Sequence, residues 1–446
     1  MTTARRRGEH PDAGAISESP LSATWRPAVF EKAVLVGIDR TGDPAALDEL
    51  AALADSAGAD PVARVVQARE RPDPATFIGK GKLAELHETV HRTQAPLVVF
   101  DDELSPGQLR TLEERLGVKV VDRTALILDI FALHARSREG KAQVELAQLN
   151  YLLPRLRGWG EAMSRLGGGI GTRGPGETKL EVDRQHIRRR ITKLRRDIAD
   201  LARTRRLKRS TRERTGIAQV AIAGYTNAGK STLMNALSDA ETLVADQLFA
   251  TLDPTVRRLE LPGGRAITVS DTVGFVRKLP HDLVEAFRST LEEVTLASLV
   301  VHVADAAAPD LDGQIAAVRE VLGEIGAGEV PEVLVLNKAD RLTTGERRQL
   351  QERYPGGVFV SALRRRGLDD LLEHVEAALP PPPIEAKLLV PYERQEVVAR
   401  LHREAEVRSS KPTDEGTALE VRLGEEQLGW AGEFVTEPVR REVPLG

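Results

Sequence analysis

Residues 224–232 of the chain have the pattern of a loop that binds phosphate. The segment Gly224-Tyr-Thr-Asn-Ala-Gly229-Lys230-Ser231-Thr232 fits G-x-x-x-x-G-K-[ST]. The apolar run before it predicts a buried strand, and the residues after Lys230 predict a helix, which is the context that this pattern requires. The two glycines let backbone N–H groups curl around an anion. We expect Lys230 to reach the β and γ phosphates of a nucleotide, and the Ser231 hydroxyl to bind Mg²⁺.

Two downstream segments have the composition of loops that sense a third phosphate. Phe249-Ala-Thr251-Leu-Asp253 precedes a predicted strand, and the Thr251 hydroxyl could complete the Mg²⁺ shell. The predicted strand 266–270 ends in Asp271-Thr-Val-Gly274. Asp271 suits an outer Mg²⁺ ligand held through water, and the Gly274 N–H could contact the γ-phosphate, whose loss would release the loop.

The tetrapeptide Asn337-Lys338-Ala-Asp340 follows another predicted strand and favours guanine as the base. A carboxylate at Asp340 can accept hydrogen bonds from N1–H and the N2 amine of guanine. Adenine lacks this pair of donors, and such a mismatch costs roughly 10⁴-fold or more in selectivity. The Lys338 stem can lie over the base, and the backbone of Ser361-Ala-Leu363 would contact guanine O6.

These segments occur in order, each near the carboxyl end of a predicted strand, where open α/β sheets bind ligands. We predict that Lys230, Thr251 and Gly274 serve catalysis, that Ser231 and Thr251 bind the metal directly, and that Mg²⁺ is the cofactor. The predicted GTP contacts are Gly224, Tyr225, Thr226, Asn227, Ala228, Gly229, Lys230, Ser231, Phe249, Ala250, Thr251, Leu252, Asp253, Asp271, Thr272, Val273, Gly274, Asn337, Lys338, Ala339, Asp340, Ser361, Ala362 and Leu363.

Phe275 follows the Asp271–Gly274 segment, where many GTPases carry a glutamine that orients the attacking water. Phenylalanine cannot hydrogen-bond to water. We therefore expect slow hydrolysis by the protein alone and completion of the site by a partner. A polar group elsewhere in the chain is the open alternative.

The charge of the chain is distributed unevenly. Residues 184–214 contain 14 Lys and Arg against three Asp and Glu, a local charge of +11; the whole chain carries −4, so the remainder carries −15. Such a basic arm favours binding to nucleic acid or to an anionic membrane. There is no apolar run long enough for a membrane span and no secretory signal pattern, and the absence of cysteine excludes disulfides and thiolate metal sites.

Six regions are predicted along the 446 residues. They are a flexible tail (1–28), an α/β domain (29–135), a glycine-rich loop with a helical hairpin (136–215), an α/β nucleotide domain (216–379), a proline linker (380–384) and an α+β domain (385–446). In the first α/β domain, Phe77-Ile-Gly-Lys-Gly-Lys82 could hold a phosphate, but an ordinary turn before a helix is favoured. In the last domain we expect strands over 387–390 and 417–423, a helix over 393–405 and a turn at 411–416.

The spacing of apolar residues predicts the helical hairpin. Lys141–Leu153 reads as one helix. From Leu180 the apolar residues follow a coiled-coil pattern: after a first gap of seven, in which Arg184 takes one position of the apolar seam, they alternate in steps of four and three. We expect the two helices to pack antiparallel with their arginines facing outward. Between them, Gly167–Lys179 has six glycines in ten residues and flanking basic side chains, and is interpreted as a binding loop rather than a passive linker.

The motifs at 224–231, 249–253, 271–275 and 337–340 together resemble those of the HflX-family GTPases, in the Obg–HflX group. The segment Gly167-Gly-Gly-Ile-Gly-Thr-Arg-Gly-Pro-Gly-Glu-Thr178 before the basic helix is the more specific part of this resemblance. The resemblance implies a G protein that binds GTP and GDP and the large ribosomal subunit, inserts its N-terminal and hairpin regions near ribosomal RNA, and splits or rescues stalled ribosomes.

From this resemblance we expect a cytoplasmic monomer off the ribosome, with peripheral membrane attachment as the open alternative. Two other functions compete with the first: a membrane-linked signalling GTPase, and an RNA-binding scaffold with a weak nucleotide site. Intact Lys230, Ser231, Asp271 and Asp340 argue against the scaffold.

Overall fold

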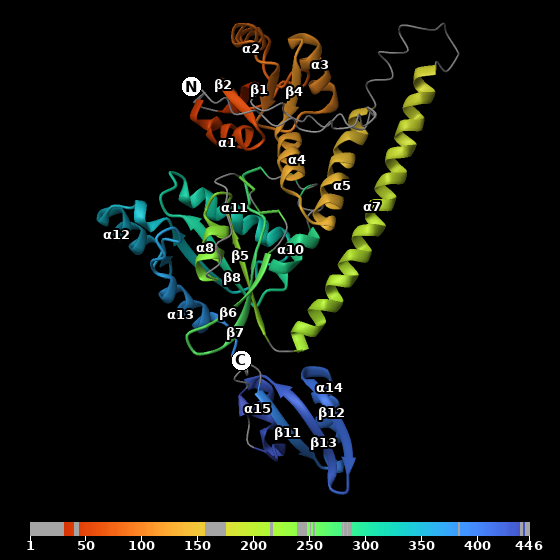
Figure 1. Ribbon diagram of the computed structural model, residues 1–446, viewed down its shortest axis with the longest axis vertical. Helices are drawn as coiled ribbons and strands as arrows, with labels where there is room; N and C mark the ends of the chain where they lie inside the picture. The colour runs from red at the N-terminus through yellow and green to blue at the C-terminus, as the bar shows by residue number, and fades with distance from the viewer. Residues whose placement is uncertain are drawn as a thin grey trace, which may run out of the picture.

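The computed structural model describes residues 31–39, 44–156, 175–214, 217–238, 248–249, 251–252, 255–278, 280, 283, 288–381, 384–437 and 440–441. They form three sheet units and a helical hairpin (Figure 1). The predicted fold class is confirmed: an α/β unit and a helical hairpin precede the larger α/β unit, and a small α+β unit follows it. Residues 157–174, which include most of the glycine-rich loop Gly167–Lys179, lie outside the described residues.

The first unit is a four-stranded parallel sheet in the order β2-β1-β3-β4. Alternate β1 side chains enter two separate cores, one beneath α1 and α4 and the other beneath α2 and α3. Its elements are β1 (Glu31–Asp39), η2 (Pro44–Leu47), α1 (Asp48–Ser56), β2 (Ala59–Ala68), α2 (Lys80–Thr93), β3 (Leu97–Phe100), α3 (Pro106–Leu116), β4 (Lys119–Asp122) and α4 (Arg123–His134).

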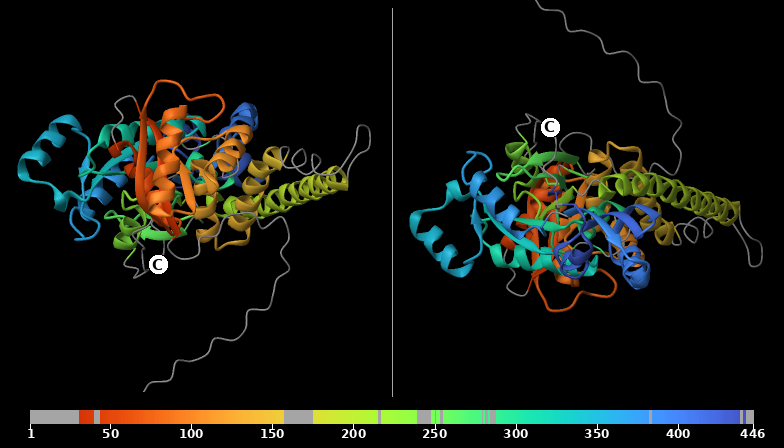
Figure 2. Two further views of the ribbon diagram at one scale, coloured as in Figure 1. Left: turned by 90° about the horizontal axis from the view of Figure 1, so that it is seen from above. Right: turned by 90° about the horizontal axis from the view of Figure 1, so that it is seen from below.

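The hairpin consists of α5 (Arg138–Arg155) and the 40-residue α7 (Pro175–Arg214). Leu149 of α5 is buried with three α7 residues, Ile187, Ile191 and Leu194, which confirms the predicted packing between the two helices. α7 begins at Pro175, earlier than the predicted start, because proline suits the first turn of a helix. The yellow end of α7 extends beyond the sheet units (Figure 2).

The second unit is a six-stranded sheet in the order β10-β9-β8-β5-β7-β6, with only β6 antiparallel to its neighbour. Helices α8 and α13 cover one face, and α10 and α11 cover the other. Its elements are β5 (Ala218–Gly224), α8 (Lys230–Leu237), β6 (Thr255–Glu260), β7 (Ala266–Asp271), α10 (Arg288–Thr295), β8 (Leu299–Asp305), α11 (Leu311–Glu324), β9 (Glu332–Asn337), η4 (Ala339–Arg341), α12 (Thr344–Arg353), β10 (Val358–Phe359) and α13 (Leu368–Ala378).

The third unit is an antiparallel sheet in the order β12-β13-β11-β14. The turn predicted at 411–416 is wrong in extent, because β12 continues to Thr413 and only Asp414 and Glu415 turn. β12 is an edge strand and therefore tolerates Pro412. The elements are β11 (Ile384–Val390), η5 (Tyr392–Arg394), α14 (Gln395–Glu404), β12 (Glu406–Thr413), β13 (Gly416–Leu423), α15 (Glu425–Ala431), η6 (Gly432–Phe434) and β14 (Arg440–Arg441).

Candidate functional site

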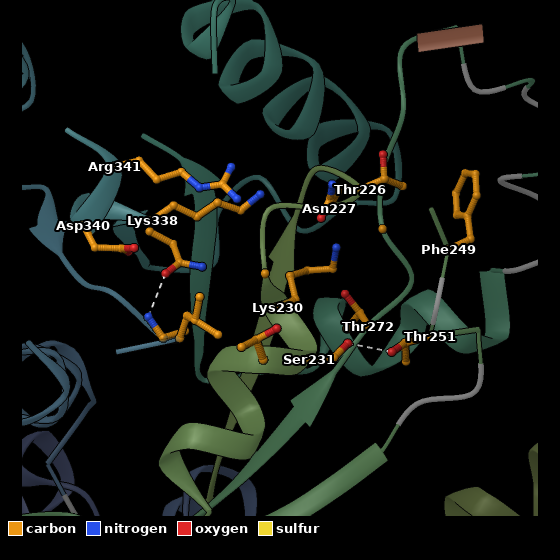
Figure 3. A pocket seen from close by; sticks show the side chains of 16 residues that line it. Thr226, Asn227, Lys230, Ser231, Phe249, Thr251, Thr272, Lys338, Asp340 and Arg341 are labelled. Carbon is orange, nitrogen blue, oxygen red and sulfur yellow. Dashed lines mark hydrogen bonds between the residues drawn. The ribbon is translucent and has the colours of Figure 1, made fainter. Parts of the chain in front are cut away.

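A cavity of about 370 Å³ lies at the carboxyl edge of the six-stranded sheet (Figure 3). It is of the size that small-molecule sites have. The predicted residues that line it are Thr226, Asn227, Gly229, Lys230, Ser231, Phe249, Thr251, Thr272, Gly274, Asn337, Lys338, Asp340, Ala362 and Leu363. Thr232 and Arg341 line it too. Neither is among the predicted contacts, although each directly follows a predicted contact residue in the chain.

Other predicted residues stand behind the cavity wall or outside the description. Gly224, Tyr225, Ala228, Leu252, Asp271, Val273, Ala339 and Ser361 do not line the cavity. Leu252 and Val273 belong to a hydrophobic core instead. Ala250 and Asp253 lie outside the described residues.

The phosphate loop, residues 224–231, is held in shape from the opposite side of the cavity. The Asn337 side chain donates from Nδ2 to the carbonyl of Ala228 at 2.8 Å. Gly229 has φ +92°, and a Cβ there would lie 2.3 Å from Asn337 Nδ2. Glycine is therefore required at this position both by backbone conformation and by space.

The Lys230 ammonium lies folded back onto the loop. Its Nζ donates to the carbonyls of Gly224 at 3.1 Å and Tyr225 at 2.9 Å. Burial lowers the pKa of Lys230 to about 8, and the nearby Asp271 carboxylate opposes that shift. An anion in the cavity would restore the charged form, because an opposite charge favours ionisation.

Three oxygen-bearing side chains converge beside Lys230. Ser231 Oγ donates to Asp271 Oδ2 at 2.6 Å, and Thr251 Oγ1 donates to the same oxygen at 3.0 Å. The two hydroxyl oxygens lie 2.7 Å apart. The other oxygen of Asp271, Oδ1, is buried without a hydrogen-bond partner. Burial also raises the pKa of Asp271. A hard cation suits this set, because Mg²⁺ prefers oxygen ligands and keeps several waters.

Gly274 closes the same end of the cavity. A Cβ at this position would lie 2.8 Å from Thr226 Cγ2 and 2.9 Å from Lys230 Nζ. The backbone of Gly274 therefore approaches the phosphate loop as closely as only glycine allows, and any anion held by Lys230 would lie within reach of it.

At the opposite end, polar groups hold Asp340 in place. Ser361 Oγ donates to Asp340 Oδ1 at 2.5 Å, and this bond lowers the pKa of the exposed Asp340 carboxyl. Lys338 Nζ is 2.8 Å from Asp305 Oδ2, which leaves the lysine stem along the cavity wall. The Ala362 N–H, predicted to face a base, donates to Asn337 Oδ1 at 3.0 Å in this structure.

The two segments that follow the phosphate loop are docked on the first sheet unit. The Leu248 N–H donates to Ser56 Oγ of α1 at 3.1 Å. Phe249 and Phe131 of α4 meet edge to face, with ring centroids 4.7 Å apart. These contacts connect the lining of the cavity to a distant part of the chain.

The segment after Gly274 docks beside them through charged side chains. Arg123 donates to the Arg277 carbonyl at 2.8 Å while also pairing with Glu49 and Asp101. Lys278 Nζ lies 2.9 Å from Asp101 and 2.6 Å from Asp102. This interface was not predicted, because its partners are far apart in the chain.

The hairpin presents a second feature, a basic face on α7. Arg189, Arg195 and Arg196 are exposed and form no ion pair with another described residue. Arg190 is exposed as well, as predicted for the arginines of this helix, but its guanidinium also binds the Glu145 carboxylate of α5, at 2.6 and 2.7 Å. Among the described residues, no helix is long and apolar enough to cross a membrane.

Models of three protein families match the chain. A GTP-binding GTPase N-terminal model matches residues 44–132, a GTP-binding GTPase middle-region model matches residues 134–212, and a 50S ribosome-binding GTPase model matches residues 219–338. Together they cover the first sheet unit from η2 onward, the hairpin and most of the second unit.

Curated relatives extend the similarity over most of the chain. A protein named GTPase HflX from Caldanaerobacter subterraneus subsp. tengcongensis is 53% identical over 369 residues, which are 82% of this chain and 84% of the relative. GTPase HflX from Escherichia coli K12 is 42% identical over 399 residues, covering 88% and 93%. A solved structure, a GTP-binding protein from Sulfolobus solfataricus in complex with GDP, is 24% identical with a TM-score of 0.42, covering 78% of this chain and 98% of that one.

Proposed function

Because the chain belongs to the HflX family of GTPases, we propose that it is a GTP-hydrolysing switch that binds the large ribosomal subunit and splits or rescues stalled ribosomes. The observation that carries the nucleotide part is the cavity itself. One end has Lys230 beside the oxygens of Ser231 and Thr251, and the other has the Asp340 carboxylate fixed by Ser361.

In this proposal the triphosphate lies along residues 224–231. Lys230 leaves its carbonyl partners and binds the β and γ phosphates, and the Gly274 backbone contacts the γ-phosphate. Ser231 and Thr251 hold Mg²⁺, with Asp271 acting through water. When bound, such a metal would supply positive charge beside the phosphate oxygens. The unpartnered Asp271 Oδ1 supports this assignment, since a metal-bound water would satisfy it.

Guanine lies at the other end, against the Lys338 stem. Asp340 accepts from N1–H and N2–H, and its lowered pKa keeps it ionised at neutral pH. For O6 to receive the Ala362 N–H, the bond from that group to Asn337 must lengthen or be shared. The nucleotide therefore replaces or shares hydrogen bonds that residues of the cavity make with one another in its absence.

The ribosomal part rests on the basic face of α7, because exposed arginines at 189, 195 and 196 suit the phosphates of RNA. Phe275, only 1% exposed, cannot orient water, so turnover by the protein alone is slow. We expect large subunits to raise turnover at least tenfold, and each tenfold corresponds to about 1.4 kcal/mol of barrier. Such a change in the barrier is modest for a partner that orders one loop.

Sedimentation with purified ribosomes and subunits tests this proposal. The protein should co-sediment with large subunits, more strongly with a non-hydrolysable GTP analogue than with GDP, and should convert intact ribosomes to subunits. Anionic liposomes form a parallel arm, because the membrane-linked alternative predicts flotation with lipid. Nucleotide-independent sedimentation, or binding to liposomes alone, would contradict the proposal.

A further inference from the structure

The phosphate loop contains a buried hydroxyl for which the nucleotide contacts proposed above give no role. Thr226 is 7% exposed, and its Oγ1 has no hydrogen-bond partner. A buried hydroxyl without a partner costs about 1–3 kcal/mol, so its retention calls for a physical reason. Thr226 lines the cavity on the side of Lys230 and Thr251, away from Asp340 (Figure 3).

The backbone holds Thr226 next to the segment that senses the γ-phosphate. The Thr226 N–H donates to the Phe275 carbonyl at 2.7 Å, and the Phe275 N–H donates to the Gly224 carbonyl at 3.1 Å. Two bonds in opposite directions fix residues 224–226 against residue 275. The position of the Thr226 Cβ relative to Gly274 is therefore set by main chain and does not depend on a mobile side chain.

The methyl group of Thr226 occupies the space beside Gly274. A Cβ built on Gly274 would lie 2.8 Å from Thr226 Cγ2. A rotation about χ1 to the neighbouring staggered rotamer, by about 120°, moves Oγ1 to the present position of the methyl group and moves the methyl group to the present position of the Cβ hydrogen. Since the hydroxyl makes no bond in the present rotamer, this rotation breaks none, and it brings Oγ1 to the place where the methyl now meets Gly274.

The residue that many GTPases use to orient water is replaced here by a side chain turned into the core. Phe275 is 1% exposed and packs in the hydrophobic cluster that also contains Phe131 and Phe249. Its ring neither bonds to water nor faces the cavity, which it does not line. A water beside the γ-phosphate therefore needs a polar partner from another residue.

We propose that the Thr226 hydroxyl is that partner, a catalytic group that accepts a hydrogen bond from the attacking water. The water oxygen bonds to the γ-phosphorus, and the bond from this phosphorus to the β–γ bridging oxygen breaks. The electron pair stays on GDP, and a proton of the water passes to a phosphate oxygen. Thr226 orients the water and gains or loses no proton. This inference rests on the nucleotide placement proposed above.

The test compares Thr226→Val, which keeps the shape and removes the hydroxyl, with Thr226→Ser, which keeps the hydroxyl. Single-turnover hydrolysis should fall about tenfold or more in the valine variant, and the serine variant should recover most of that loss. Affinities for GDP and for a non-hydrolysable GTP analogue should change less than twofold in both. Binding of GDP with aluminium fluoride, which mimics the transition state, should weaken in the valine variant alone.

The outcomes separate this inference from the proposed function. Hydrolysis by Thr226→Val at the wild-type rate, with and without large subunits, would overturn the role of the hydroxyl and leave the nucleotide site intact. Equal losses in the valine and serine variants would overturn it too, since packing would then explain the effect. Failure of the nucleotide placement itself would show differently, as unchanged GTP affinity in Ser231→Ala and Asp340→Asn.

Discussion

Phe131 and Phe249 are 118 positions apart in the chain, yet their rings meet edge to face with 4.7 Å between centroids. Phe131 belongs to α4 of the first sheet unit, and Phe249 precedes Thr251, whose hydroxyl lies beside Ser231 and Asp271. The aromatic contact thus holds the segment that carries a predicted metal ligand. In this structure the Ser231, Thr251 and Asp271 oxygens are hydrogen-bonded to one another, so these residues would have to give up such bonds to hold Mg²⁺.

Removing this contact should release the segment. Phe131→Ala should cost about 3 kcal/mol of unfolding free energy, as ring truncations in cores do. It should also raise basal GTP turnover severalfold, because Thr251 then rearranges around the metal more easily. Phe77→Ala is the matched control: Phe77 makes an edge-to-face pair with Phe100 at 5.8 Å inside the first unit. Equal turnover in the two variants, at similar loss of stability, would show that the contact is only structural.

Base choice should depend on Asp340. Asp340→Asn replaces an acceptor by an amide, which mispairs with the N2 amine of guanine but suits O2 of xanthine. The loss of two charge-assisted hydrogen bonds should weaken GTP binding roughly a hundredfold. The affinity for XTP should rise relative to the affinity for GTP. Fluorescent GTP and XTP titrations measure both, with Asp369→Asn on α13 as a control of equal charge. A mutant with full preference for GTP would exclude Asp340 as the reader of the base.

Ser231 and Thr251 should differ in the nucleotide state that needs them. Ser231→Ala should weaken Mg²⁺-dependent binding of both GDP and a GTP analogue, because the residue adjoins Lys230 in the phosphate loop. Thr251→Ala should weaken mainly the analogue, since its segment responds to the γ-phosphate. Each loss should be about tenfold, or about 1.4 kcal/mol. A similar loss of GDP affinity in both variants would refute this division of roles.

Nucleotide binding should depend on pH through Lys230. The free protein loses the Lys230 proton near pH 8, because burial lowers its pKa to about 8. Bound phosphates favour the ammonium, so binding takes up a proton above that pH. Affinity for Mg-GDP should therefore be constant below pH 7 and fall above pH 8. The slope of this fall should approach about tenfold in affinity per pH unit. Lys230→Arg, whose charge persists, should lack this fall between pH 7 and 9. Parallel pH profiles for the two proteins would contradict the assignment.

Local sequence patterns predicted the site better than they predicted its surroundings. Continuous apolar runs such as Val220–Ala223 identify buried parallel strands, and the polar residues that follow must then meet at one edge of the sheet. β2 is not evident in the sequence, because it is an edge strand whose side chains are mostly exposed or only partly buried. α4 is not evident either, because it is apolar almost all round, and a helix buried on several sides has no polar face to reveal its period.

The contacts between units could not be predicted from the sequence for a different reason. Arg123, Asp101 and Arg277 have no spacing relative to one another that a helix or strand would produce. Their meeting depends on how the two sheet units pack against each other. The outward arginines of α7 were predicted from a helical repeat, which fixes the face of the helix but not the reach of a partner side chain. The repeat therefore does not predict the ion pair between Arg190 and Glu145 of α5.

The ion pair between Arg190 and Glu145 changes which arginines of the basic arm should be replaced in a test. Arg189, Arg195 and Arg196 are exposed on α7 and lie outside the bond between Arg190 and Glu145. Replacing all three with glutamine should weaken binding to large subunits. It should also flatten the slope of log affinity against log salt concentration, by up to the contribution of about three phosphate contacts. GTP affinity of the isolated protein should stay unchanged, because these side chains are remote from the cavity.

The matched control removes the same charge from α12, by Arg347→Gln, Arg348→Gln and Arg353→Gln, which are also exposed. Binding to large subunits is measured between 50 and about 200 mM salt, the range over which phosphate contacts change affinity most visibly. If the α7 and α12 triple variants show the same slope as the wild type, the arm is a solvated helix. If both lower the slope equally, the net charge of the protein governs binding. A flatter slope for the α7 variant alone identifies this helix face as the one that contacts phosphate.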